Sequence, residues 1–255
     1  MIELKTEGEL RAMREAGRVV AHALAAVREH ARVGVSLLAL DEVAAEVIHD
    51  AGAKPSFLNY RPGSAPSPYP AVTCISVNDA IVHGIPTSYR LRDGDLFSVD
   101  CGAHLGGWCG DSAISFVVGE ADPADSKLIE RTADALHAGI AAAQPGARLG
   151  DVSHAVGVVA RRHGYGIMAD HGGHGVGRAM HEAPHVPNEG KPGKGLTLRP
   201  GMALAIEPMF TAGGRDSYRK DPDGWTLRTS DGSRAAHVEH TIAITEDGPQ
   251  ILTAS

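Results

Sequence analysis

Four acidic residues lie in apolar, strand-like surroundings, where an ionised carboxylate needs a counter-charge. Asp100 stands in LFSVDCG and Asp111 in GDSAISF, 11 positions apart across a glycine-rich turn. Two strands joined by that turn would bring both carboxylates to the same place. Glu207 follows the apolar run MALAI, and Glu239 lies in AAHVEHTIAI. One such acid fits a structural role such as a turn cap, but four predict a shared site, because burying an unpaired charge is costly.

Histidine supplies a second type of ligand. The segment HGGHGVGRAMHEAPH contains His171, His174, His181 and His185. Glycines on both sides of His174 would let the backbone approach a metal, and the alternative is a flexible loop with incidental histidines. His83, in IVHGIP, is a lone histidine at a predicted strand end and by itself fits ordinary packing. Mixed imidazole and carboxylate ligands favour Mn, Fe, Co or Zn over Ca, and four carboxylates would balance two divalent cations.

Two other motifs in the same segment point to different chemistry. HEAPH, residues 181–185, matches the H-E-x-x-H zinc pattern, which requires both histidines on one face of a helix. Pro184 lies inside the motif and disfavours a helix there. GGHGVGR resembles a nucleotide-binding loop, but it lacks the G-x-G-x-x-G spacing, and the chain has no G-K-[ST]. The sequence therefore favours neither a zincin site nor a nucleotide site.

The segments that carry these residues show helical and strand-like patterns in turn. Apolar spacing and caps predict helices over residues 6–31, 36–49, 123–144 and 151–163, and short strands over 71–77, 81–85, 96–101 and 113–118. Glycines 18 positions apart enclose an apolar helix at 34–52 and again at 146–164, which weakly indicates an internal duplication. Each copy is a helix pair followed by strands. This order predicts an α+β fold in a single catalytic domain over residues 1–255.

Composition limits the possible function classes. With 255 residues and 43% hydrophobic composition, the chain is large enough for one large core or two small ones. A formal net charge of -7 argues against nucleic-acid binding, and no apolar run reaches the length of a membrane span. The start, MIELKTEGEL, has a helix-capping pattern and not that of a signal peptide. Three cysteines without C-x-x-C spacing predict small buried side chains and a reducing cytoplasm, and RPGSAPSPYP predicts a surface loop.

In this order, IVHGIP, the Asp100/Asp111 pair, GGHGVGRAMHEAP, LAIEPM and VEHTI resemble the bacterial form of type I methionine aminopeptidase. The similarity runs from LKTEGELRAMREAGRV to the last strand. It implies a pita-bread fold, in which two pseudo-symmetric halves surround a central antiparallel sheet. It also implies two divalent ions (Co, Mn, Fe or Zn), with Asp111 and Glu239 bridging both. Asp100 would complete one side, His174 and Glu207 would complete the other, and a bridging water would be the nucleophile.

The same resemblance implies the other functional residues. Glu207 would act as the proton shuttle, His83 would lie near the substrate amine or scissile nitrogen, and His181 near the carbonyl oxygen. The residues near the methionine pocket would be Tyr60, Tyr69, Cys74, Met180 and Trp225. The chain departs from the family pattern at the pocket rim. The position before His181 is usually aromatic but is Met180 here, and the loop over 61–68 is longer than in many relatives.

The activity implied is removal of the initiator methionine, when the second residue is small, from nascent polypeptides at the ribosome exit. A cytoplasmic monomer is implied as well. One rival is a pita-bread peptidase that cleaves before proline, which would share the five metal ligands but generally carries a sizeable N-terminal domain. Here the catalytic helices begin near residue 6. Another rival is a non-catalytic binding protein of this fold, but such relatives have lost metal ligands and all five positions are filled here.

Overall fold

Helix pairs and antiparallel strands follow each other twice along the chain in this computed structural model, which describes residues 2–63 and 65–254. The helices in these residues are α1 (Glu7–His30), α2 (Leu37–Asp50), α3 (Pro123–Ala142) and α4 (Leu149–Arg162). The strands of the first half are β1 (Lys54–Pro55), β2 (Thr73–Val77), β3 (Ala80–Val82), β4 (Asp95–Leu105) and β5 (Trp108–Val118). Those of the second half are β6 (Gly166–Ile167), β7 (Gly172–Gly175), β8 (Glu182–Pro187), β9 (Ala203–Ile206), β10 (Met209–Thr211), β11 (Tyr218–Lys220), β12 (Leu227–Thr229), β13 (Ala235–His237), β14 (Glu239–Thr245) and β15 (Gly248–Ile251).

The helices begin at the caps that the local sequence predicts, with one exception. Thr6 caps α1, and the Glu9 carboxylate accepts a hydrogen bond from the Thr6 N–H at 2.8 Å, which completes the capping box. Asp122 caps α3, with proline at the first helical position. Helix α4 begins two residues earlier than predicted. Asp151 does not cap the helix; it sits in the first turn and accepts a hydrogen bond from the Arg148 N–H at 2.8 Å.

Helices α2 and α4 occupy equivalent places in the two halves. Each has 14 residues and lies between two glycines. The four glycines, Gly34, Gly52, Gly146 and Gly164, have φ values between 68° and 90°. Glycine adopts this left-handed backbone at no steric cost, whereas other residues are strained there. The repeated glycine spacing therefore marks equivalent helix-flanking turns, as an internal duplication predicts.

A large antiparallel sheet joins the two halves. Within the described residues it has nine strands in the order β1-β4-β5-β14-β9-β7-β8, with β2 paired to β4 and β15 to β14. Two three-stranded sheets, β13-β10-β6 and β11-β12-β3, stand beside it. Strand β3 ends before His83, earlier than the predicted 81–85, because His83 takes the left-handed φ of 58°.

Strands β4 and β5 are longer than the short segments predicted. Each has 11 residues, and they pair continuously from Asp95 with Val118 to Leu105 with Trp108. Glycine interrupts the apolar pattern of both strands in the sequence, but in the sheet it permits close packing. A Cβ atom at Gly110 would lie 2.7 Å from the Cα atom of Gly17, so β5 can touch α1 only without a side chain at Gly110.

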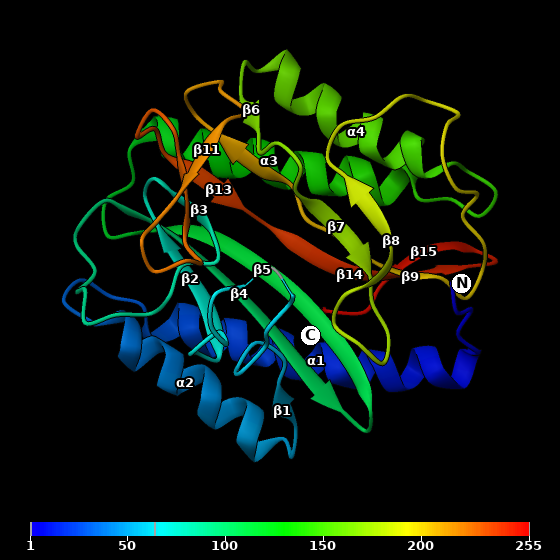
Figure 1. Ribbon diagram of the computed structural model, residues 1–255, viewed down its shortest axis with the longest axis horizontal. Coiled ribbons are helices and arrows are strands. Elements are labelled where there is room, and N and C mark those ends of the chain that lie inside the picture. The colour runs from blue at the N-terminus through cyan, green and yellow to red at the C-terminus, as the bar shows by residue number, and fades with distance from the viewer. Residues whose placement is uncertain (1, 64, 255) are drawn as a thin grey trace.

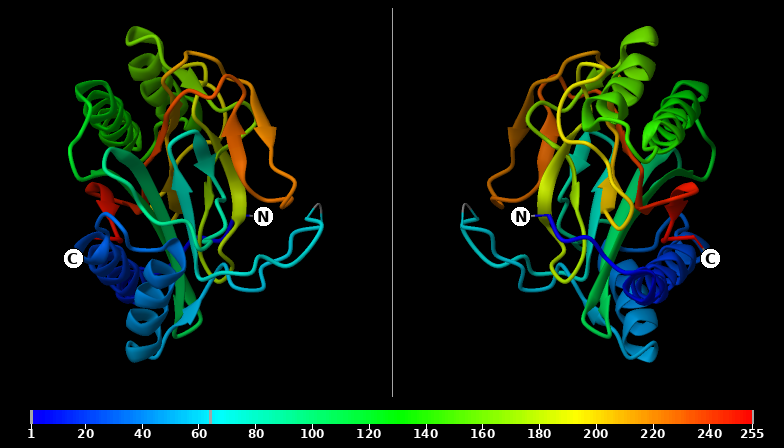
Figure 2. Two further views of the ribbon diagram at one scale, coloured as in Figure 1. Left: turned by 90° about the vertical axis from the view of Figure 1, so that its left-hand side faces the viewer. Right: turned by 90° about the vertical axis from the view of Figure 1, so that its right-hand side faces the viewer.

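The helices all lie on one face of the large sheet, as the pairs α1–α2 and α3–α4 (Figure 1). Figure 2 shows the four helices on one side and the β11–β12 hairpin and the loop after β1 projecting from the other side. One apolar core lies between α1, α2 and strands β2, β4 and β5, and a second lies between α3, α4 and strands of the second half. The predicted arrangement of two α+β halves is confirmed, and it leaves the second face of the sheet free for a site.

Three further expectations concern the cysteines, the loop over 61–70 and the membrane. All three cysteines are buried and free, as predicted. The loop is mostly exposed, as predicted, although Tyr69 near its end is buried and Ser64 lies outside the described residues. Within residues 2–63 and 65–254, none of the helices combines the length and the hydropathy needed to cross a bilayer.

Candidate metal centre and substrate pocket

Strand register places three of the predicted acids on one face of the large sheet. Asp100 of β4 lies opposite Ala113 of β5, and Ala113 lies opposite Glu239 of β14. Asp100 and Glu239 therefore stand in one row across three strands. Asp111 precedes Ala113 by two residues, so its side chain projects from the same face. The predicted meeting of Asp100 and Asp111 is confirmed, and the turn between β4 and β5 produces it.

Glu207 and His174 reach this row from the second half. Glu207 directly follows β9, whose last residue, Ile206, pairs with His240 of β14. His174 lies in β7, the next strand of the sheet. The Nε2 atom of His174 is 3.5 Å from Glu207 Oε1 and 3.8 Å from Asp111 Oδ2. Ligand atoms of Asp111, His174 and Glu239 all lie within 4.8 Å of one another, a spacing that a metal ion can fill.

The glycines beside His174 pack closely against neighbouring strands. A Cβ atom at Gly173 would lie 2.0 Å from the Ala205 carbonyl oxygen, and one at Gly175 would lie 2.3 Å from that of Ala183. They let β7 fit between its neighbouring strands, a packing role that the sequence analysis did not predict. The Nδ1–H of His174 donates to the Gly175 carbonyl at 2.9 Å. This bond fixes the tautomer and leaves the lone pair of Nε2 directed at the acids.

Burial dominates the electrostatics of the cluster. It raises the pKa of Asp100 to about 7 and that of Glu207 to about 8. Burial, followed by repulsion from a neighbouring carboxylate, raises the pKa of Asp111 and of Glu239 well above the usual range. Burial also lowers the pKa of His174 to about 3, so its imidazole is neutral. Four carboxyl groups thus share a site in which none of the described side chains supplies the positive charge needed to balance them.

The unpartnered atoms of the site test whether cations fit it. Within the described residues, Asp100 Oδ1, Asp111 Oδ1 and Glu239 Oε1 are buried without a hydrogen-bond partner. Buried polar atoms are normally paired, and these three belong to side chains on the same face of the sheet. Divalent cations would pair these oxygens and balance the carboxylates, and with an imidazole nearby the donor set suits Mn, Fe, Co or Zn.

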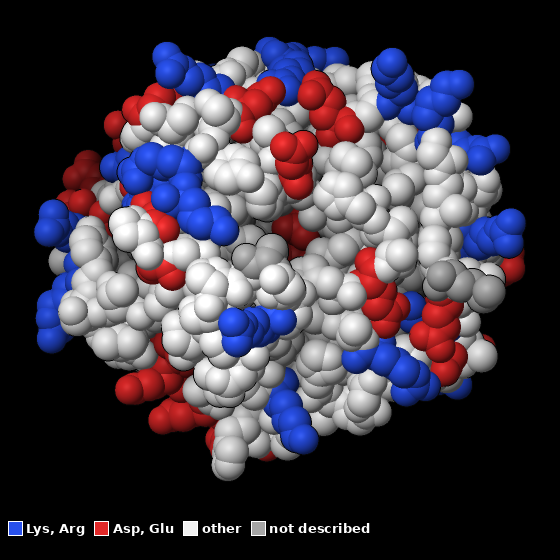
Figure 3. Space-filling model, in the orientation of Figure 1, with Lys and Arg blue, Asp and Glu red and all other residues white. Residues whose placement is uncertain are grey.

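A cavity of about 190 Å³ lies beside the acids. Figure 3 shows acidic atoms at the bottom of a hollow near the centre of this face, with mostly uncharged side chains around it. Twelve of the fourteen described residues that line the cavity are those predicted from the sequence: Tyr60, Tyr69, Cys74, His83, Asp100, Asp111, His174, Met180, His181, Glu207, Trp225 and Glu239. Of the other two, Pro62 belongs to the loop over 61–68 that was assigned to the pocket rim, and Phe57 was missed by the sequence analysis.

The apolar wall of the cavity begins directly beside the acids. Cys74 of β2 lies opposite Asp100 of β4, so both side chains face the cavity. The ring of Trp225 stands edge-on to that of Tyr69, with centroids 5.1 Å apart. The Tyr69 hydroxyl donates to the Gly84 carbonyl at 2.8 Å, which leaves its ring as the surface toward the cavity. This wall suits an apolar side chain, because it is largely aromatic.

Two wall histidines approach the acids from different halves of the chain. The ring of His83 lies 6.5 Å from that of Trp225 and 6.3 Å from that of His171. Burial and the neighbouring His171 lower the pKa of His83 to about 3, so this ring is neutral. His181 lies at the exposed mouth, 4.2 Å between centroids from His174. A neutral imidazole carries one N–H donor, and a substrate held in the cavity would meet these two.

Comparisons with known proteins agree with this geometry. A profile of metallopeptidase family M24 matches residues 11–246. The chain belongs to metallopeptidase family M24. It is 52% identical to methionine aminopeptidase 1 of Mycobacterium tuberculosis, over 99% of this chain and 95% of that protein. It is 46% identical to methionine aminopeptidase 1 of Bacillus subtilis, over 99% of each. Within M24 it therefore groups with the methionine aminopeptidases, as its motifs predict, and the family's chemistry is metal-dependent hydrolysis.

Solved structures place this M24 chain in the same group. The crystal structure of methionine aminopeptidase from Thermotoga maritima superposes with a TM-score of 0.95 at 42% identity and covers 100% of both chains. The prolidase from Pyrococcus furiosus gives a TM-score of 0.78 at 23% identity, and covers 99% of this chain but only 65% of that one. The second likeness shows the shared fold alone. The pita-bread prediction is confirmed, and the likeness to the rival Xaa-Pro peptidases is weaker.

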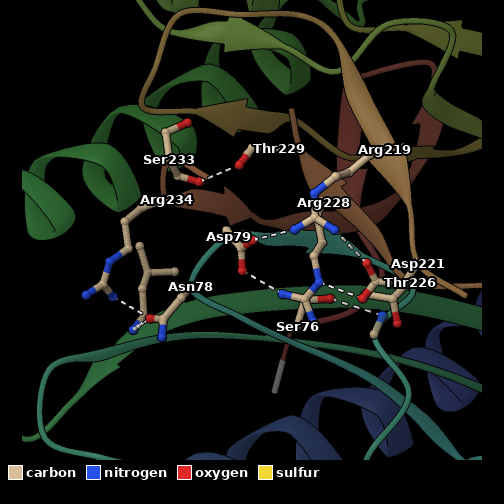
Figure 4. Close-up of polar contacts among 12 residues, drawn as sticks. Ser76, Asn78, Asp79, Arg219, Asp221, Thr226, Arg228, Thr229, Ser233 and Arg234 are labelled. Atoms are coloured by element: carbon tan, nitrogen blue, oxygen red, sulfur yellow. Dashed lines mark hydrogen bonds and ion pairs between the residues drawn. The ribbon is translucent and has the colours of Figure 1, made fainter. Parts of the chain in front are cut away.

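An ion-pair network connects two walls of the M24 pocket. It consists of Asp79, Asp221, Arg219 and Arg228 (Figure 4). Arg228 donates to Asp79 and to Asp221 at 2.6 Å each, and Arg219 donates to the same two carboxylates at 3.2 and 2.9 Å. Asp79 stands in the turn before β3, and Asp221 in the β11–β12 hairpin turn that also carries Trp225. The four charges therefore fix the aromatic wall relative to the β2–β3 hairpin.

The HEAPH motif does not form a zincin site in this M24 fold. Residues 182–187 form strand β8 and not a helix, as Pro184 predicts. The Glu182 carboxylate accepts hydrogen bonds from Lys5 Nζ and from the Ala179 N–H, both at 3.0 Å. His185 is exposed on β8. Glu182 therefore holds the chain start and the preceding turn together, and the motif match is coincidental.

The sequence analysis missed His237. This residue ends β13, two positions before Glu239, and is only 2% exposed. Its Nε2 atom lies 3.6 Å from Glu207 Oε2 and 3.8 Å from Glu239 Oε2. The alternation of His237 and Glu239 in AAHVEHTIAI was the available signal, because residues two apart in an extended segment share a face.

Proposed function

We propose that this M24 peptidase removes the N-terminal methionine from polypeptides, with two divalent cations held by Asp100, Asp111, His174, Glu207 and Glu239. The observation that carries the proposal is that these five residues line the same cavity as an apolar, aromatic wall. The cavity volume of about 190 Å³ lies below the usual range for drug-sized ligands and suits a single side chain. The chain acts as one catalytic domain.

The ligands divide between the two cations according to their neighbours. Asp111 lies within ligand distance of His174, and the side chain of Asp100 projects from the same face of the sheet. Glu239 belongs to two groups of closely spaced ligand atoms. These positions support bridging roles for Asp111 and Glu239, with Asp100 on one side and His174 and Glu207 on the other. The cations are Co, Mn, Fe or Zn, since all four accept this donor set.

When bound, the cations would lower the pKa of a water molecule, which is the nucleophile, and would polarise the scissile carbonyl. Glu207 would move the proton, because its carboxylate lines the cavity beside the other acids and lies 3.5 Å from His174 Nε2. His83 donates a hydrogen bond near the substrate amine or scissile nitrogen. His181 donates one to the carbonyl oxygen, where negative charge develops.

The substrate's first side chain lies against Tyr69, Cys74 and Trp225. Burial and the charge of Asp100 raise the pKa of the Cys74 thiol well above its usual value, so it remains an uncharged, soft surface beside the acids. A thioether packs favourably on aromatic edges and on such a surface. Tyr60, Met180 and the loop over 61–68 form the rim, which meets the second residue and restricts it to small side chains. The substrates are nascent polypeptides at the ribosome exit in the cytoplasm, and the enzyme acts there as a monomer.

A pair of peptides tests the proposal. Purified protein stripped of metal is assayed on Met-Gly and Xaa-Pro peptides of equal length, with and without added Mn or Co. We expect hydrolysis of the Met-Gly peptide alone, and only with added metal. Preferential cleavage of the Xaa-Pro peptide would contradict the substrate assignment. Absence of cleavage of either peptide with bound metal would support a binding protein instead.

A further inference from the structure

The candidate metal centre contains two closely spaced ligand groups, and each includes one histidine. The first group is Asp111, His174 and Glu239, and the second is Glu207, His237 and Glu239. Within each group the ligand atoms lie within 4.8 Å of one another. Glu239 is the shared member, which is the arrangement expected of a carboxylate that bridges two cations.

The spacing around His237 matches that around His174. Its Nε2 atom lies 3.6 and 3.8 Å from its two carboxylate oxygens, and that of His174 lies 3.5 and 3.8 Å from its own two. These separations are too long for hydrogen bonds. Two donors bound to one tetrahedral ion at about 2.1 Å are roughly 3.4 Å apart, so both sets of distances fit a shared cation.

The surroundings of His237 explain its position but leave its ring nitrogen free. Its backbone N–H donates to the Ser115 hydroxyl at 3.0 Å, and that hydroxyl lies 2.6 Å from the His237 carbonyl oxygen. The Ser98 hydroxyl lies 2.7 Å from that of Ser115, so β13 is held on β4 and β5. Nε2, by contrast, is buried and has no hydrogen-bond partner among the described residues. The backbone of His237 is thus held in place while its unpartnered Nε2 faces carboxylates, which is the environment expected of a metal ligand.

We propose that His237 is a second imidazole ligand of the metal centre and would hold a cation together with Glu207 and Glu239, the two carboxylates its Nε2 atom faces. The inference rests on the proposed metal centre and extends its donor set to four carboxylates and two imidazoles. An added imidazole strengthens the binding of Zn, Co or Fe relative to Mn, which prefers oxygen donors. His237 therefore determines which metal the second position selects.

The test measures metal binding directly. Co²⁺ is titrated into metal-free wild-type protein, His237→Gln and the control His185→Gln, which removes an exposed imidazole on β8. Calorimetry, bound-metal analysis and the visible absorption of Co²⁺ follow each addition. We expect His237→Gln to keep one tight site, to lose roughly tenfold or more in affinity at the other, and to change the absorption spectrum. We expect a smaller loss for Mn²⁺, and wild-type behaviour in His185→Gln.

A second measurement uses unaltered protein and covers the case in which His237→Gln does not fold. In the proton NMR spectrum of the protein with two Co²⁺ ions, hyperfine-shifted imidazole signals from two histidines are expected. Signals from one histidine only, or a His237→Gln variant with unchanged affinities and spectrum, would overturn the role of His237 while leaving the proposed function intact. Wild-type protein that binds no divalent cation would instead overturn the proposed function itself.

Discussion

The floor and the rim of the cavity are built in different ways. The floor residues Asp100, Asp111 and Glu239 are held by the hydrogen-bond ladder of a long sheet, whose register determines the face of every side chain. The rim residues Tyr60 and His181 lie outside the strands, on connecting segments. Sheet register permits no partial displacement, because a slip of one residue would turn each carboxylate to the other face. Floor substitutions should therefore remove activity outright, whereas rim substitutions should have graded effects.

The largest effect is expected at the bridging carboxylate. Asp111→Asn removes one negative charge from a buried cluster without changing its size, so the fold should persist while both cations bind weakly. Turnover of a Met-Gly peptide at saturating Mn should fall nearly to zero, and bound metal should fall with it. Asp50→Asn, at the exposed end of α2, is the matched control and should behave like wild type. Wild-type turnover in Asp111→Asn would contradict the claim that the floor residues are essential for activity.

Two histidines opposite each other on β7 and β8 give a sharper contrast. His174 and His185 are cross-strand partners, but only His174 is directed at the acids. His174→Ala should abolish activity and weaken metal retention, and His185→Ala should lower activity only modestly. Glu207→Gln should resemble His174→Ala. Metal analysis and rate are measured on the same samples. Loss of metal in His185→Ala, with metal kept in His174→Ala, would reassign the site to HEAPH.

At the rim, His181→Ala should separate turnover from metal binding. This side chain is exposed at the mouth and, in the proposed mechanism, donates a hydrogen bond to the carbonyl oxygen as charge develops there. Removing such a donor typically lowers kcat by about 10²-fold. Bound metal should stay at the wild-type level. Loss of metal together with activity would show that His181 helps to bind the metal, as the floor residues are proposed to do.

The charged network behind the aromatic wall should show a still smaller effect. Arg228→Gln breaks the contacts to Asp79 and Asp221 that hold the hairpin of Trp225. The wall would then be less well fixed, so KM for a Met-Gly peptide should rise a few-fold while kcat changes little. Each lost charge-assisted hydrogen bond is worth about 1.5–3 kcal/mol, so the unfolding temperature should also fall. A large drop in kcat with unchanged KM would contradict this role and would show that the network affects the floor carboxylates instead of the aromatic wall.

The smallest effect concerns the stability of metal-free protein as a function of pH. Burial raises the pKa of Asp100 to about 7 and of Glu207 to about 8, above the values near 4 in the unfolded chain. A raised folded pKa contributes stability that is complete below the unfolded pKa and is lost as pH rises through the folded value. The unfolding temperature of metal-free protein should therefore fall as pH rises from about 4 to about 8, and divalent metal should reverse the fall. A metal-free protein that gains stability over this range would contradict these pKa values.

The floor could be predicted from the sequence because a charge in an apolar strand is conspicuous. Asp100 and Glu239 stand out in LFSVDCG and AAHVEHTIAI, and strand alternation then determines their face. His237 stands two residues before Glu239 in the same segment, but it escaped notice because a single histidine in an apolar segment also fits ordinary core packing. Phe57 and Pro62 of the rim lie in an irregular segment whose path no periodic pattern describes.

Strand length was less predictable than site composition for a related reason. Gly102 and Gly110 break the apolar pattern of β4 and β5, so the sequence suggested shorter strands. The contact that requires Gly110, with Gly17 of α1, joins residues far apart in the chain. The packing role of the glycines beside His174 was missed for the same reason, since the atoms that they approach lie on other strands. Local patterns identified the chemistry, whereas tertiary packing decided the role of the small residues.

The most direct test of the central claim is the stoichiometry at which metal restores hydrolysis. Protein is stripped with a chelator until bound metal is negligible, and Mn or Co is then added while the rate on a Met-Gly peptide and the bound metal are both measured. We predict no hydrolysis without metal, full recovery on addition, and two ions per chain at saturation. Hydrolysis at the full rate by protein shown to be free of metal would contradict the proposed two-metal mechanism, as would saturation at a single ion with maximal activity.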